Sequence, residues 1–190
     1  MPLEQSLKPD ISEQIKVTCL PCASSAAAEW RARLVISLLD PDLPKSAHPR
    51  IEHCRHQTFL FHDQERQDAT GHFHEALRPA LELVTEHLRG GEPRLLIHCH
   101  AGVSRSTALA YGAISMILGP GLENEAFEAL LGITHKPWPN RRVVECIDGI
   151  LGRDGALLAP LDAMRAQFPR RIDHYRRFNR RRGLVSGRSR

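Results

Sequence analysis

Apolar residues in the first half of the chain gather in short runs of strand length, and polar or proline-rich segments separate these runs. The runs cover residues 15–20, 34–39, 56–61 and 95–98. The run LVISLL at 34–39 is apolar almost throughout, which is typical of a strand covered on both faces of an α/β sheet. We therefore predict a mostly parallel sheet of four or five strands.

Helical periodicity fills the segments between and after these runs. One helix has apolar residues at helical spacing, namely Phe73, Leu77, Leu81, Val84 and Leu88. Gly90 and Gly91 end this helix, and Pro79 should kink it or mark a boundary. We predict further helices over residues 24–33, 106–118, 123–134, 140–151 and 157–168. Strands and helices alternate first and helices alone follow, which favours an α/β fold with flanking helices and a helical C-terminal half.

The composition is that of one ordinary globular domain. The chain has 190 residues, of which 42% are apolar and 25% charged. Its most apolar helical stretch, residues 108–118, is about half of the roughly 20 residues that a membrane span needs. The start, MPLEQSLKPD, lacks the basic end and apolar run of a secretory segment. We therefore expect a cytoplasmic protein with no membrane span, whose five scattered cysteines are thiols.

Positive charge is concentrated at the C-terminal end. Residues 165–190 hold ten arginines and one acid, while residues 1–164 hold sixteen basic and twenty-one acidic residues. The isoelectric point of about 9.0 therefore describes a tail and not the body of the chain. We predict one folded domain over residues 1–168 and a basic tail over 169–190. The tail is either a solvated end or short helix, or a segment that binds an acidic partner, an anionic membrane surface or RNA.

The segment LLIHCHAGVSRSTALAYGAI joins an apolar strand to a small-residue helix. The strand ends at Cys99, five residues follow, and Arg105 and Ser106 open the helix. A loop in this place turns backbone N–H groups inward and adds the field of the helix N-terminus, and Gly102 allows it to curl. The guanidinium of Arg105 matches two phosphate oxygens, and the positive field favours the thiolate form of Cys99. The segment predicts a nucleophile aimed at the phosphorus of a phosphate ester.

These residues match a known family. The spacing of His98, Cys99, Arg105 and Ser106 resembles the signature of cysteine-dependent protein phosphatases, and AGVSRS at 101–106 resembles the dual-specificity branch. The resemblance implies a phosphatase-like fold, a catalytic domain within residues 1–168, and hydrolysis of phosphotyrosine, phosphoserine or phosphothreonine through a phosphocysteine, without metal or cofactor. The residues implied to bind the substrate phosphate are His100, Ala101, Gly102, Val103, Ser104 and Arg105.

The leaving oxygen needs a proton, so a general acid should lie on a loop above the cysteine. Asp63 and Asp68 lie 36 and 31 residues before Cys99. The resemblance places this aspartate just after a strand, so we favour Asp63 and keep Asp68 as the alternative acid. An aspartate here could also only cap a loop. By the same resemblance, Ser106 stabilises the departing thiolate.

Three further residues have supporting roles by resemblance. His98 would orient the loop, and Asn140, which follows Pro139 at the start of a late helix, would brace it. His100 either touches the substrate or is simply exposed. Two other functions stay open, a phosphate-binding module without turnover and a rhodanese-like sulfurtransferase. Thr107 after Ser106, together with the upstream acid, favours phosphate.

Two other groups of residues invite a chemical interpretation. Cys19 and Cys22 are spaced like a thioredoxin-type redox pair, but the helices that follow do not fit that fold, so two structural thiols are favoured. Another group crowds one region without the compact spacing of a metal site, so we expect no bound metal. Its members are His48, His53, Cys54, His56 and His62.

Overall fold

A sheet of four parallel strands forms the centre of the molecule. The structure, a computed structural model, describes residues 10–65, 72–91, 94–135 and 137–181. The strands are β1 (Ile15–Cys19), β2 (Leu34–Leu39), β3 (Arg55–Leu60) and β4 (Leu95–Cys99). Their order is β1-β4-β2-β3, and every neighbouring pair is parallel. The predicted parallel sheet is confirmed, with the lower of the two expected strand numbers.

The two inner strands, β2 and β4, are apolar because they are covered on both faces of the sheet. Every residue of β2 and of β4 is buried, so neither strand needs a polar face. The edge strands β1 and β3 are only partly buried, with exposed Lys16 and Arg55 among their residues. The strand that carries Cys99 therefore lies inside the sheet, between β1 and β2.

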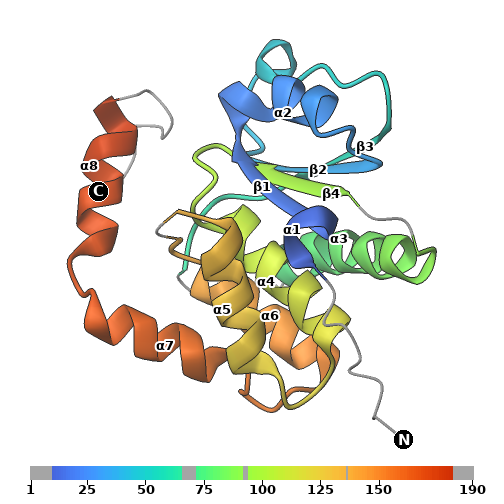
Figure 1. Ribbon diagram of the computed structural model, residues 1–190. Coiled ribbons are helices and arrows are strands. Elements are labelled where there is room, and N and C mark those ends of the chain that lie inside the picture. The colour runs from blue at the N-terminus through green and yellow to red at the C-terminus, as the bar shows by residue number, and fades with distance from the viewer. Residues whose placement is uncertain (1–9, 66–71, 92–93, 136, 182–190) are drawn as a thin grey trace, which may run out of the picture.

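Helices cover the two faces of the sheet unequally (Figure 1). On one face lie α3 (His72–Arg89), α4 (Arg105–Leu118), α5 (Glu123–Ile133) and α6 (Arg141–Leu151), around the main apolar core. The short α2 (Ala23–Glu29) covers the other face, with a small second cluster that includes Val35 and Leu96. In α4 the eleven residues 105–115 are all buried, which its many small side chains permit.

The remaining elements are short or peripheral. They are α1 (Ile11–Gln14), η1 (Leu20–Cys22), η2 (Lys45–Ala47), α7 (Leu158–Gln167) and α8 (Arg171–Arg181). The sequence pattern gave no signal for α1, because four residues show no periodicity. The basic tail begins as a helix, and Ile172 and Tyr175 of α8 pack against the main core. No helix in the described ranges is long and apolar enough to cross a membrane.

Two predicted boundaries were wrong. The helix expected over 24–33 ends at Glu29, because the chain turns at Arg31, which has a φ of 53°, before β2 begins. Pro79 does not divide α3, which continues from His72 to Arg89. Pro79 lies on the exposed side of this helix, where water can satisfy the carbonyl group that loses its donor.

Helices α4 and α6 approach most closely at Gly112. A Cβ atom on this residue would lie 2.8 Å from Cγ2 of Ile147, closer than van der Waals contact allows. Gly149 of α6 offers a matched comparison, because a Cβ there would meet nothing within 4 Å.

We expect alanine to have opposite effects at these two glycines. Gly112→Ala should lower the free energy of unfolding by about 1–3 kcal/mol, because Ile147 must move in a packed core. Gly149→Ala should raise it by about 0.5–1 kcal/mol, because alanine loses less backbone entropy in a helix. Urea unfolding of the two variants measures both changes. A Gly112→Ala variant as stable as the parent would contradict the close packing described here.

Candidate active site

The candidate site lies at the carboxyl end of β4, where the strand leads into α4. Cys99 is the last residue of β4 and is 1% exposed. We call residues 100–105, which connect its strand to the first turn of α4, the anion loop. Parallel strands bring their carboxyl ends to one edge of the sheet, so the segments after β1, β2 and β3 begin near the anion loop.

Gly102 presses the anion loop against the end of β1. Its φ of +70° is unfavourable for other residues, and a Cβ would lie 2.7 Å from the carbonyl oxygen of Thr18. Backbone atoms cannot yield as a flexible side chain would. The position therefore requires glycine for two independent reasons, and it fixes the loop to the neighbouring strand.

The carbonyl groups of the anion loop bind segments outside it. The oxygens of His100, Val103 and Ser104 accept from the backbone N–H groups of Leu20 (3.1 Å), Trp138 (2.9 Å) and Asn140 (3.2 Å), respectively. The backbone N–H groups of 101–104 donate to no acceptor within the described part of the chain. A loop with its carbonyls held outward and its amides unpaired is suited to bind an anion.

Cys99 and Ser106 lie side by side beneath this loop. Their Sγ and Oγ atoms are 3.1 Å apart, and both side chains are buried. The Ser106 hydroxyl can therefore donate a hydrogen bond to a thiolate at Cys99. The structure brings these two predicted residues together at the N-terminus of α4.

The guanidinium of Arg105 is buried, with 2% of the side chain exposed. Its Nη1 donates to Oδ1 of Asp40 at 2.7 Å and to the carbonyl oxygen of Phe61 at 2.5 Å. Its Nε has no hydrogen-bond partner among the described residues and lies 3.9 Å from Oδ2 of Asp63. One nitrogen is thus held by the protein, while another remains a buried donor that an oxyanion could satisfy.

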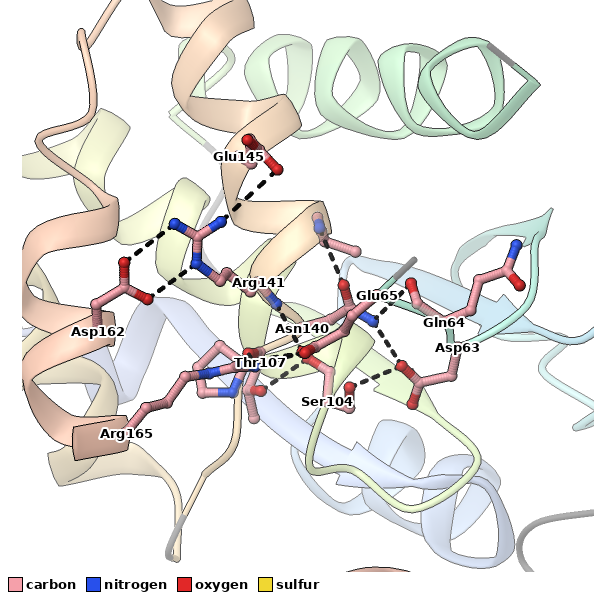
Figure 2. A network of polar contacts seen from close by, with 12 residues as sticks. Asp63, Gln64, Glu65, Ser104, Thr107, Asn140, Arg141, Glu145, Asp162 and Arg165 are labelled. Carbon is pink, nitrogen blue, oxygen red and sulfur yellow. Dashed lines mark hydrogen bonds and ion pairs between the residues drawn. The ribbon is translucent and has the colours of Figure 1, made fainter. Parts of the chain in front are cut away.

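Asp63 lies directly over the anion loop (Figure 2). Its Oδ1 accepts from Oγ of Ser104 at 2.8 Å and from Nδ2 of Asn140 at 2.7 Å. The side chain is 30% exposed, so the carboxyl group is partly open to water. We call residues 61–65, which follow β3 and carry Asp63, the acid loop. Asp68, the alternative acid, lies outside the described residues.

Asn140 connects the acid loop, the anion loop and α6. Its Oδ1 accepts from the N–H of Val143, which caps α6, and its own N–H donates to Ser104. Its Nδ2 group reaches Asp63. The Asn140 side chain is fully buried, while Asp63 at the far end of one bond is partly open to water. Asn140, predicted to brace the anion loop, therefore contacts that loop with its backbone and the acid loop with its side chain.

His98, which precedes Cys99, lies among buried polar side chains of the sheet. The His98 ring is buried and its Nε2 lies 2.5 Å from Oγ of Ser37, which also contacts Nε2 of His56 at 2.7 Å. Burial lowers the pKa of His98 to about 4, so the ring is neutral at pH 7.

His100 was expected to touch substrate or to be exposed. Its side chain is 14% exposed and lies against the end of β2, where Nε2 accepts from the N–H of Asp40 at 3.2 Å. Burial lowers its pKa, against the opposing effect of Asp40. Simple exposure is therefore wrong for His100.

Asp40 is the main residue that the sequence interpretation missed. It follows β2 directly and contacts both Arg105 and His100. The signal was available, because an acid at the carboxyl end of an inner parallel strand should lie beside the loop after the next strand. Asp40 opens one of the proline-rich segments between the apolar runs, which carry no pattern that marks a functional residue.

The other chemically suggestive groups lie around this site. Cys19 ends β1 in register with Cys99, and burial, followed by its hydrogen bond with Cys22, raises the pKa of its thiol. All five cysteines are free. Of the histidine-rich group considered for metal, His62 lies with Asp40 and Asp42, their ligand atoms within 4.8 Å of one another.

The chain resembles known proteins in its three-dimensional structure and not in its sequence. No protein-family model and no curated protein sequence matches the chain. Human DUSP28 matches with a TM-score of 0.56 and 16% identity, over 83% of this chain and 97% of that one. The human tyrosine phosphatase-like serine/threonine/tyrosine-interacting protein matches with a TM-score of 0.59 and 16% identity, over 75% and 93% of the two chains. A mouse putative dual specificity phosphatase complexed with zinc tungstate matches with a TM-score of 0.52 and 19% identity, over 88% and 95%.

These similarities identify the fold. The chain has the α/β fold of the dual-specificity and related cysteine-dependent phosphatases, with its helical C-terminal half. The fold expected from the signature around Cys99 is thereby confirmed.

The buried His98 ring should make stability depend on pH. Its pKa is about 4 in the folded protein and 6.5 ordinarily, so between these values the unfolded chain binds a proton that the folded chain does not. Stability should therefore fall as the pH drops from 7 to 4, by roughly 3 kcal/mol from this group. His98→Gln, which can still reach Ser37, should lose that part of the dependence, as measured by urea unfolding across this range. His174→Gln, at an exposed histidine, is the control and should keep the parent slope. An unchanged slope in His98→Gln would show that the ring is not buried in its neutral form.

Proposed function

We propose that the chain is a cysteine-dependent phosphatase that hydrolyses phosphomonoesters on tyrosine, serine or threonine residues of proteins. One observation carries the proposal. A buried cysteine lies beneath a loop with unpaired amides at 101–104, beside an arginine whose Nε is a buried donor without a partner among the described residues. An anion bound beside Cys99 would give hydrogen-bond acceptors to these half-buried amides and to the buried Nε.

In the first proposed step, the non-bridging oxygens of the phosphate accept from the anion-loop amides and from Arg105. The Cys99 thiolate attacks phosphorus, an S–P bond forms and the P–O bond to the leaving group breaks. Asp63, which lies over the loop, gives its proton to the leaving oxygen. The proposed product is a phosphocysteine and a free alcohol or phenol.

In the second proposed step, water replaces the sulfur. The Asp63 carboxylate takes a proton from the water as it attacks phosphorus, and the S–P bond breaks. The Ser106 hydroxyl, 3.1 Å from Sγ, donates to the departing thiolate. Inorganic phosphate leaves, and Asp63 is again protonated. Side chains and amides of the chain perform every step, so the proposed reaction calls for no metal or cofactor.

The proposal includes where the protein works and what surrounds the site. The catalytic residues lie within the domain proposed at 1–168. A reducing compartment such as the cytoplasm would keep the five cysteines free, as they are in the structure. The tail at 169–190 is proposed to bind an acidic partner, because α8 carries five arginines against the single acid Asp173.

The two alternatives differ from the proposal in what they release. A phosphate-binding module would hold a phosphate ester without freeing phosphate. A sulfurtransferase would form thiocyanate from thiosulfate and cyanide. The position of Asp63 over the loop supports phosphatase chemistry, because only that chemistry needs a proton at the leaving oxygen.

Removing the nucleophile should abolish turnover. We expect the parent protein to release phosphate from an aryl phosphate in the presence of a metal chelator, and Cys99→Ser to release none above background. Cys146→Ser, at a half-buried cysteine of α6, is the control and should remain active. Phosphate release by Cys99→Ser would refute the phosphocysteine mechanism. Thiocyanate formation by the parent in place of phosphate release would favour the sulfurtransferase.

The two candidate acids can be separated by their alanine variants. Asp63→Ala should lower kcat by about 10²–10⁴-fold, as expected for loss of a general acid, and Asp68→Ala should have little effect. The measurement is the steady-state rate on an ester with a poor leaving group, for which the proton matters most. The reverse pattern would assign the acid to Asp68.

A further inference from the structure

An ion pair links the end of the acid loop to α7. Arg165 of α7 reaches Glu65, 100 residues earlier, with Nη1 3.0 Å from Oε2 and Nη2 in contact with Oε1. The same Nη2 donates to the carbonyl oxygen of Pro139 at 2.7 Å, and the guanidinium lies 4.9 Å from the centre of the Trp138 ring. A two-pronged arginine–carboxylate pair fixes both position and orientation.

The same carboxylate also meets the start of α6. Oε1 of Glu65 accepts from the N–H of Arg141 at 3.0 Å, one residue after Asn140, which binds Asp63 (Figure 2). Two consecutive residues at this helix start therefore hold two acids of the acid loop. A shift of Glu65 would move Asp63 with it, since only Gln64 separates them.

Backbone N–H groups of this loop do little to hold it in place. It belongs to no helix or strand, and its backbone makes two N–H bonds among the described residues, from Phe61 to Leu39 and from Gln64 to His62. The second of these lies within the loop and cannot anchor it. Side-chain contacts must therefore set where Asp63 lies relative to Cys99.

From these contacts we infer that the Glu65–Arg165 pair is a latch that positions Asp63 for proton transfer. Both are positioning residues, because they act through Asp63 and do not touch the reacting atoms. The inference rests on the proposed function and adds α7 to the elements that it requires. The Arg165 side chain is 15% exposed and that of Glu65 is 42% exposed, so the pair is partly shielded from water on the side of the arginine.

The neighbouring pair of Arg141 and Asp162 provides a matched control. It joins α6 to α7 through two bonds, from Nε to Oδ1 at 3.0 Å and from Nη2 to Oδ2 at 3.1 Å, so both pairs end on α7. In Figure 2 the Arg141 side chain reaches Asp162 and Glu145, while its backbone N–H reaches Glu65. Asp162→Asn therefore weakens a neighbouring ion pair of α7 and keeps both residues of the latch.

The test compares esters that differ in their need for a proton. Phenyl phosphate has a poor leaving group, phenolate. On this ester, Glu65→Gln and Arg165→Met should each lower kcat by about 10- to 100-fold, as expected for a misplaced catalytic group. On p-nitrophenyl phosphate, whose p-nitrophenolate departs without protonation by an acid, the loss of kcat should be much smaller. Asp162→Asn should match the parent on both esters. In an Asp63→Ala background, neither latch variant should cause a further loss, because the group that they position is gone.

Equal losses on both esters, or losses that persist in the Asp63→Ala background, would overturn the latch and leave the proposed function intact. If the parent released no phosphate from either ester, the proposed function would fail. Hydrogen–deuterium exchange of residues 61–65 would then decide the latch. Faster exchange in both latch variants but not in Asp162→Asn would support it, and unchanged exchange would refute it.

Discussion

The whole site depends on the direction in which one short loop turns its carbonyl groups. Three oxygens of the anion loop are held by N–H groups from the end of β1 and from the segment before α6, and Gly102 is pressed against Thr18. Because these bonds point outward, the amides at 101–104 have no acceptor in the described chain. The loop therefore presents free N–H donors that favour a bound anion, and the segments after β1 and before α6 hold the loop in this orientation.

The buried positive charge of Arg105 is compensated by partners within the fold. Burying a guanidinium is costly unless its donors find partners. Asp40 and the carbonyl oxygen of Phe61 satisfy Nη1, and they directly follow β2, which pairs with β4, and β3, which pairs with β2. The charge is thus kept in place by the same sheet edge that presents Cys99. These bonds fix the guanidinium beside the anion loop.

Local signals in the sequence were sufficient for the parts of the site that lie close together along the chain. The strand, the glycine and the helix start around Cys99 could be read from one segment, and Asn140 could be recognised where a helix begins. The partners of Arg105 and Glu65 could not, because they are fixed by strand order and by the packing of α7. The end of α2 was missed for a similar reason, since the turn at Arg31 is set by where β2 must enter the sheet. Periodicity reports which face of an element is buried, but it does not report which elements become neighbours.

The separation of the interacting residues along the chain has a consequence for biosynthesis. Asp63 binds residues 41 and 77 positions away, and Glu65 binds residues 76 and 100 positions away. A ribosome produces the cysteine, the arginine and both acids well before it reaches α7. A nascent chain that has just exposed β4 and α4 therefore holds the proposed reactive groups without the contacts from Asn140 and Arg165. The site is completed only as the last helices emerge and dock, so the order of synthesis itself delays assembly until the domain is nearly whole.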